Sequence, residues 1–162
     1  MPSVNGKPAI WTSDNETKMK TDYPDLSYFT TTLQNYLSDY HPQLLSDASF
    51  IEIRCEQASE IFARCVRDGC SCMEAMRQTN DALHAGLAFS KYQTILSVLE
   101  QDFDAIPEPQ RRSVAERMLP VCEPVFSLYE INDDFEYSPE FNILTFELIG
   151  TIQIYLDEHG VQ

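Results

Sequence analysis

Few residues in this sequence can build a phosphate loop, a nucleic-acid interface or a histidine-based active site. The 162 residues include only 5 glycines and 3 histidines, and Lys+Arg number 11 against 26 for Asp+Glu. No G-x-S-x-G, glycine-rich phosphate loop or H-E-x-x-H pattern occurs. The sequence therefore predicts no catalytic residue, no cofactor and no enzymatic activity. Its formal charge of −15 also disfavours direct binding to nucleic acid or to an anionic membrane, because both would be repelled.

Long apolar runs are missing as well. The start of the chain lacks the uninterrupted apolar stretch of roughly 7–15 residues that a signal peptide needs. Later runs such as Leu148–Leu156 are far shorter than the roughly 20 residues that span a bilayer. We therefore expect a cytoplasmic protein that binds no membrane. Five cysteines, an odd number without a secretion signal, indicate reduced thiols in that compartment.

A zinc site is only loosely suggested by Cys65, Cys70, Cys72 and His84. Their spacing is C-x4-C-x-C-x11-H, whereas structural zinc sites usually combine two closely spaced ligand pairs. Cys55 and Cys65 instead share one helical stripe with apolar residues, which indicates small core side chains. The sequence therefore predicts buried or idle thiols and no metal site.

Apolar residues recur at spacings of three and four from about residue 25 onward, which is typical of helices. Ser71 and Ser90 are expected to cap two of these helices, and Gly69 is expected to end another. Pro120 and Pro124 are expected to break a helix that begins near residue 108. The predicted helices cover residues 25–40, 47–68, 71–87, 90–103, 108–119 and 138–156.

The last of these segments has apolar residues around nearly its whole circumference, which is typical of a helix surrounded by others. No strict alternation of apolar and polar residues indicates a strand. The predicted fold is therefore all-α: a compact single-domain bundle of about six helices with a largely buried C-terminal helix. Residues 1–22 are predicted to be a flexible polar leader, and residues 23–162 a single helical domain.

The acidic charge is concentrated near the C-terminus. Residues 121–162 contain nine acids and no Lys or Arg, and six of the acids lie between Glu123 and Glu140 among aromatic residues. A solvated acidic loop anchored by its aromatics would explain this pattern, and so would a docking surface for a basic protein partner. A calcium loop is disfavoured, because the segment has no glycine. The candidate interaction surface comprises Glu123, Phe126, Tyr129, Glu130, Asp133, Asp134, Phe135, Glu136 and Tyr137.

The histidines offer little support for catalysis. His41 and His159 lie at predicted helix ends, where a cation would complement the helix dipole. His84 follows Leu83 and is expected to be partly buried. A nucleophile paired with one of these histidines has no support in the spacing.

Seven short segments together resemble an uncharacterised domain family of small acidic proteins carried on conjugative transposons and related mobile elements of gut anaerobes. The resemblance extends over about residues 22–162. The family has no established activity, so it implies no site residues; it implies a gene carried near DNA-processing functions. The segments are Asp25–Phe29, His41–Pro42, Phe89–Tyr92, Cys122–Phe126, Asp133–Phe135, Pro139–Phe141 and Gly150–Leu156.

Three functions are compatible with these observations. The favoured one is a non-enzymatic protein–protein interaction module that serves the DNA-processing machinery of a mobile element. An alternative is an acidic DNA mimic that blocks a host DNA-binding or restriction protein, and its binding should weaken strongly with salt. A small enzyme comes third, and a closed pocket that brings His84 to a carboxylate would support it.

Overall fold

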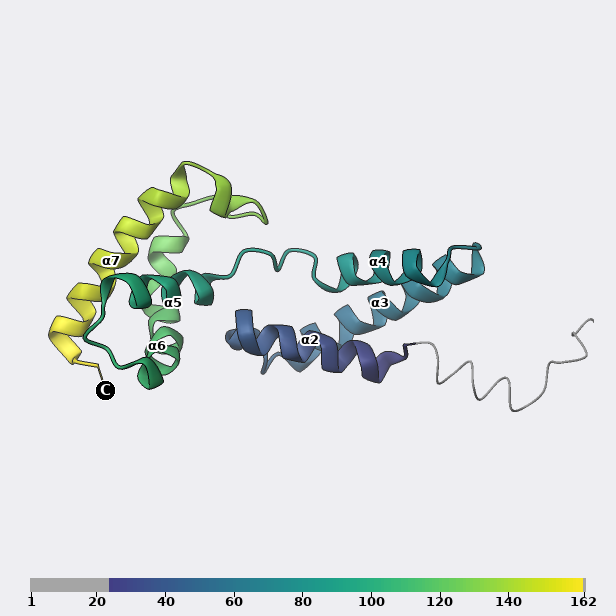
Figure 1. Cartoon of the computed structure of the whole chain (residues 1–162), viewed down its shortest axis with the longest axis horizontal. Helices are drawn as coiled ribbons and strands as arrows, with labels where there is room; N and C mark the ends of the chain where they lie inside the picture. The colour runs from purple at the N-terminus through teal and green to yellow at the C-terminus, as the bar shows by residue number, and fades with distance from the viewer. Residues whose placement is uncertain (1–23, 162) are drawn as a thin grey trace, which may run out of the picture. The chain divides into compact units, whose positions relative to one another are not determined.

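The computed structural model describes residues 24–161, and within that range every regular element is a helix (Figure 1). The all-α prediction is confirmed. The predicted leader lies outside the described residues. No described helix is both long and apolar enough to cross a membrane. The elements are α2 (Leu26–Tyr40), η2 (Pro42–Leu44), α3 (Ala48–Arg67), α4 (Cys72–Leu83), α5 (Lys91–Asp102), α6 (Glu108–Phe126), η3 (Phe135–Tyr137) and α7 (Glu140–His159).

The chain forms two compact units. The first contains the residues up to Leu33 together with Ile51–Leu83, and the second contains Gln34–Phe50 together with the chain from His84 onward. Helix α2 therefore contributes its first half to one unit and its second half to the other. The predicted single domain over residues 23–162 stays a prediction.

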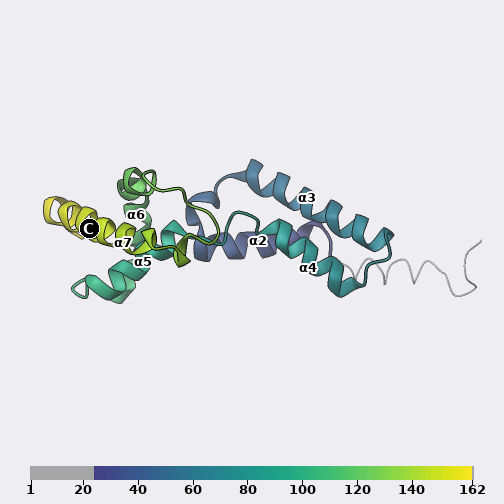
Figure 2. The ribbon, with the colours of Figure 1, turned by 90° about the horizontal axis from the view of Figure 1, so that it is seen from above.

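In the first unit, α3 buries the stripe that its sequence predicts. Cys55 and Ala58 are fully buried, and the rings of Phe62 and Phe29 lie 6.4 Å apart. Helix α3 ends as expected at Gly69, whose φ of 91° is a left-handed conformation that glycine adopts without steric cost. The chain then reverses into α4 (Figure 2). The Ser71 hydroxyl caps α4 by accepting a hydrogen bond from the Glu74 amide at 3.1 Å.

The same turn overturns the prediction that all five thiols are reduced. Cys65 and Cys70 form a disulfide, with their Cα atoms 5.3 Å apart. The pairing follows from the turn itself, because the Cys70 amide donates back to the Cys65 carbonyl at 3.0 Å and brings the two residues together. Cys55, Cys72 and Cys122 remain free thiols, of which only Cys72 is exposed.

The core of the second unit lies between α5, α6 and α7, which all contact one another (Figure 1). Helix α5 begins at the predicted cap: the Gln93 amide donates to the Ser90 hydroxyl at 2.9 Å. Ile95, Met118 and Leu148 represent the three helices in this core and are completely buried.

Helix α6 runs without interruption from Glu108 to Phe126, so the expected break at Pro120 and Pro124 is wrong. Each proline lacks a backbone N–H, so the carbonyl four residues earlier loses its helical hydrogen bond. Both prolines lie on the exposed face of α6, where water can satisfy the freed carbonyl. The opposite face is held in the core by Met118 and Cys122, which are completely buried.

The prediction of a largely buried C-terminal helix needs correction as well. Helix α7 buries one stripe of Leu144, Leu148 and Ile152. The other face leaves Phe146 74% and Ile154 62% exposed. Apolar composition around the whole circumference did not mean burial around it, because the main neighbours of this helix among the described elements, α5, α6 and η3, leave one of its faces exposed.

Candidate interaction surface

Phe135 anchors the acidic segment to the core of the second unit. Its side chain is only 4% exposed, and it sits in the short helix η3. Edge-to-face contacts surround it: the ring centroids of Phe89, Tyr129 and Phe141 lie 5.4, 5.8 and 6.3 Å away. Phe126 is also buried. These two members of the predicted surface therefore lie in the core and position the acidic loop from beneath.

Around this anchor the loop forms an open hollow of about 590 Å³ with an acidic rim. Two large apolar side chains of the lining are strongly exposed, Leu128 by 72% and Tyr137 by 80%. Apolar groups this exposed beside one hollow form a patch that could hold a partner side chain. The lining includes Leu128, Tyr129, Glu130, Asp134, Tyr137 and Glu140.

Two of the predicted acids do not line this hollow and bind groups of the same unit. Glu123 holds the Lys91 ammonium, with both carboxylate oxygens 3.0 Å from Nζ. The Asp133 carboxylate accepts a hydrogen bond from the Ala88 amide at 3.3 Å. Glu123 therefore joins α6 to α5, and Asp133 joins the loop to the segment before α5, so both carboxylates have structural partners within the unit.

The other acids of the loop have no such neutralising partner. Glu130, Asp134, Glu136 and Glu140 make no ion pair with any Lys or Arg of residues 24–161. Their charge affects the tyrosines: the hydrogen bond with Glu136 raises the pKa of Tyr137 above its usual value. On the neighbouring helix, Glu147 accepts a hydrogen bond from the Tyr129 hydroxyl and raises its pKa to about 12. The hollow therefore has a negative rim that favours cationic groups.

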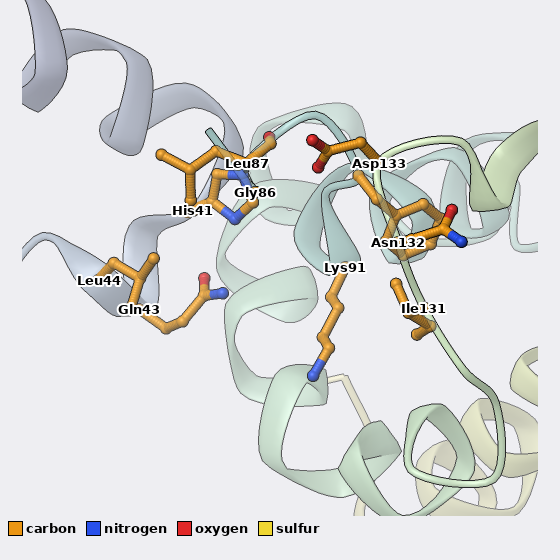
Figure 3. A pocket seen from close by; sticks show the side chains of 10 residues that line it. His41, Gln43, Leu44, Gly86, Leu87, Lys91, Ile131, Asn132 and Asp133 are labelled. Atoms are coloured by element: carbon orange, nitrogen blue, oxygen red, sulfur yellow. Dashed lines mark hydrogen bonds between the residues drawn. The ribbon is translucent and has the colours of Figure 1, made fainter. Parts of the chain in front are cut away.

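A second hollow of about 410 Å³ lies beside the first residues of α5 (Figure 3). His41, Lys91 and Asp133 reach it from three separate segments. The lining contains no Ser, Thr or Cys side chain that could act as a nucleophile. His84, the histidine on which an enzymatic hypothesis rested, does not line it.

His41 is not the helix-end cation that the sequence predicts. Its side chain is buried at 5% exposure, and Nε2 lies 2.8 Å from the Leu87 carbonyl oxygen. Burial lowers the pKa of His41, and the bond to Leu87 only partly opposes this effect. The Tyr36 hydroxyl donates to the same carbonyl at 2.9 Å. His41 therefore joins the end of α2 to the start of the α5 segment as a neutral, hydrogen-bonded side chain.

No group of three or more His, Cys, Asp or Glu side chains in the described chain is arranged to hold a metal ion. The loosely suggested zinc ligands are separated by their other contacts. Cys65 and Cys70 are bonded to each other, while the His84 ring lies 4.7 Å from that of Tyr36. Cys72 is left alone at the start of α4.

Comparison with known proteins places the chain in a family. A family model described as a domain of unknown function (DUF1896) matches residues 21–161. The chain belongs to this family. This match confirms the expected resemblance to a domain family of unknown function, over nearly the range that the sequence predicted.

This DUF1896 chain is also similar to a protein of known structure. The crystal structure of protein PG0816 from Porphyromonas gingivalis matches with a TM-score of 0.80 and 33% sequence identity. The match covers 91% of this chain and 98% of that one. No curated protein matches. The similarity therefore supports the fold and supplies no activity to transfer.

Sequence reasoning missed three features of this region: the burial of His41, the hollow beside it, and the structural contacts of Glu123 and Asp133. The pairs Glu123–Lys91 and Asp133–Ala88 join residues 32 and 45 positions apart. No local pattern signals contacts of that separation. The Cys65–Cys70 disulfide had a local signal, since the two cysteines flank a glycine at a predicted helix end.

Proposed function

We propose that this protein is a non-enzymatic protein–protein interaction module that binds a partner with a basic surface. The proposed setting is the DNA-processing machinery of a mobile element, where the chain would act as an accessory. The carrying observation is the hollow near η3, which combines exposed Leu128 and Tyr137 with carboxylates that no described Lys or Arg neutralises. Apolar contact and charge of one sign are thus available in the same place.

The two kinds of group would contribute differently to binding. Burying Leu128 or Tyr137 against a partner would contribute about 1.5–3 kcal/mol each, because each side chain is now mostly in water. The rim acids Glu130, Asp134 and Glu140 would speed encounter with a cationic surface and select against acidic partners. Because Phe135 fixes the loop from below, the surface loses little conformational freedom on binding.

The DNA-mimic hypothesis has weaker support. A mimic needs carboxylates spaced along one face like successive phosphates. Here Glu130, Asp134 and Glu140 surround a single hollow with exposed apolar side chains in its lining. A mimic would also lose binding steeply with salt, whereas a surface with an apolar component would keep part of its affinity.

A pull-down with tagged protein from cells that carry the gene in its native setting tests the proposal. Three baits are compared: the wild type, a Leu128→Ser/Tyr137→Ser double variant, and a Met73→Ser control. Met73 is a matched control because its side chain is 83% exposed and lies in the other unit. We expect basic DNA-processing proteins to survive a high-salt wash with the wild type and the control, and to be lost with the double variant.

The outcomes separate the hypotheses. Mimicry would be favoured if host DNA-binding proteins bind both the wild type and the double variant at low salt and leave both at high salt. If no captured protein depends on these two residues at either salt concentration, the interaction proposal is wrong. Circular dichroism of the double variant checks that its helices are intact.

A further inference from the structure

Helix α7 exposes an apolar stripe that the fold does not use. Ile143, Phe146 and Ile154 are 55%, 74% and 62% exposed. Together with Gly150 they follow spacings of three, four and four, so they lie on one face of the helix. Three large apolar residues in line on one helix differ from the scattered exposed residues of an ordinary surface. This stripe is opposite the buried one that holds α7 in its unit.

Gly150 lies in the middle of this stripe, and residues 24–161 give no reason for a glycine there. A Cβ atom placed on Gly150 would meet nothing of the described structure within 4 Å. Glycine is among the least favourable residues in a helix interior, and here neither a positive φ nor close packing against a described residue requires it. A second backbone approaching from outside would benefit from the missing side chain, since interaxial distance depends on the residues at the crossing.

We propose that two copies of this chain associate through α7, antiparallel, with Gly150 on the two-fold axis. In this register the residue four positions before Gly150 faces the residue four positions after it in the other copy. Phe146 therefore packs on Ile154 of the second copy, and the symmetry repeats the contact on the other side of the axis. The stripe is self-complementary because its two largest exposed members are equally far from the glycine.

The charges of α7 favour an antiparallel pair over a parallel one. Its four carboxylates would repel a second copy if they faced one another. In a parallel pair each would meet its own counterpart. In the antiparallel pair no acid meets its own counterpart: Glu147 meets Gln153 and Asp157 meets Ile143, while Glu140 and Glu158 of the two copies are offset by two positions along the pair.

Salt dependence distinguishes this occupant from a basic helix. Two copies carry −15 each, so their long-range repulsion opposes association and is screened by added salt. Self-association through the stripe should therefore strengthen as salt increases. A Lys-rich partner helix on the same acidic stripe would bind more weakly as salt increases.

Sedimentation equilibrium of the full chain measures the association. The variants are Phe146→Glu on the stripe and Met73→Glu as a matched control, since both side chains are more than 70% exposed and Met73 belongs to neither proposed surface. We expect the wild type and Met73→Glu to approach twice the 18.6 kDa chain mass as concentration or salt rises. Phe146→Glu should remain monomeric, with at least a tenfold weaker association.

Cross-linking tests the register separately. In a Cys72→Ser background, which removes the exposed free thiol, a short bismaleimide should link Gly150→Cys chains into covalent dimers. Ile143→Cys chains should not be linked, because the two positions would lie about 21 Å apart along the pair, seven residues on each side of the axis at 1.5 Å per residue.

Three results would overturn the proposal. A wild type that is monomeric at every concentration and salt excludes the dimer. A dimer that Phe146→Glu leaves intact uses another surface. A monomer that binds a synthetic Lys/Leu amphipathic peptide through Phe146 assigns the stripe to a basic partner instead. None of these tests depends on the acidic hollow, so the two proposals can fail independently.

Discussion

Replacing Phe135 by alanine tests whether one buried ring supports the whole acidic surface. Phe135 is 4% exposed and has three aromatic neighbours with centroids between 5.4 and 6.3 Å away. Phe→Ala changes in cores cost about 3–5 kcal/mol, and edge-to-face ring pairs add to the cost of lost area. We therefore expect Phe135→Ala to lower the free energy of unfolding by about 4 kcal/mol.

Two further variants calibrate that value. Phe135→Leu keeps much of the apolar volume and loses the ring contacts, so it should cost about 1–2 kcal/mol. Tyr137→Ala changes a side chain of the same loop that is 80% exposed, and it should cost less than about 0.5 kcal/mol. The ordering Phe135→Ala, Phe135→Leu, Tyr137→Ala follows from burial alone and does not depend on what the loop binds.

Urea unfolding followed by helical circular dichroism measures all three. With a slope of about 2 kcal/mol per molar urea, the Phe135→Ala midpoint should fall by about 2 M. The slope should stay unchanged, because a changed slope would mean that unfolding exposes a different amount of surface or is no longer two-state. If Phe135→Ala costs no more than Tyr137→Ala, the ring does not anchor the loop and the reasoning about a preformed surface is refuted.

Three more predictions concern other parts of the chain. A thiol titration should find three reactive thiols in denatured, unreduced protein and five after reduction, and in the native state Cys72 should react first. Reducing the Cys65–Cys70 bond should lower the free energy of unfolding, measured in urea, by about 2 kcal/mol. Because His41 has a lowered pKa when folded, the unfolded chain binds a proton that the folded chain does not, so stability should fall as the pH drops below about 6.5. A His41→Gln variant, measured over the same pH series, should lack this component; an identical pH dependence would contradict a neutral buried His41. Ser90→Ala removes the α5 cap and the hydroxyl bond to the Tyr40 carbonyl, and thermal melting should show a loss of about 1–2 kcal/mol, whereas an unchanged melting temperature would argue against the cap.

The sequence predicted those parts of the fold that depend on near neighbours. Caps at Ser71 and Ser90 and the helix end at Gly69 involve backbone groups within three or four residues, so their patterns are readable without a structure. The burial of Cys55 and Phe62 followed in the same way from the apolar stripe of one helix. Net charge and its concentration after residue 120 needed only counting.

Tertiary structure decided the features that depend on which face meets which neighbour. Pro120 and Pro124 did not break α6, because both fell on its exposed side while Met118 and Cys122 held the other side in the core. Burial lowered the pKa of His41, and its ring nitrogen found a partner in the Leu87 carbonyl, 46 positions away.

The candidate surface divides along the same line. Its acidic and aromatic composition is a property of the sequence, and so is membership of the DUF1896 family. The sequence does not determine which members of the surface point outward. The packing of η3 against Phe89 and Phe141 buried Phe135 and left Tyr137 in water. Residues as close in sequence as Phe135 and Tyr137 can be assigned to core or surface only when the elements that cover them are known, because burial depends on contacts between distant parts of the chain.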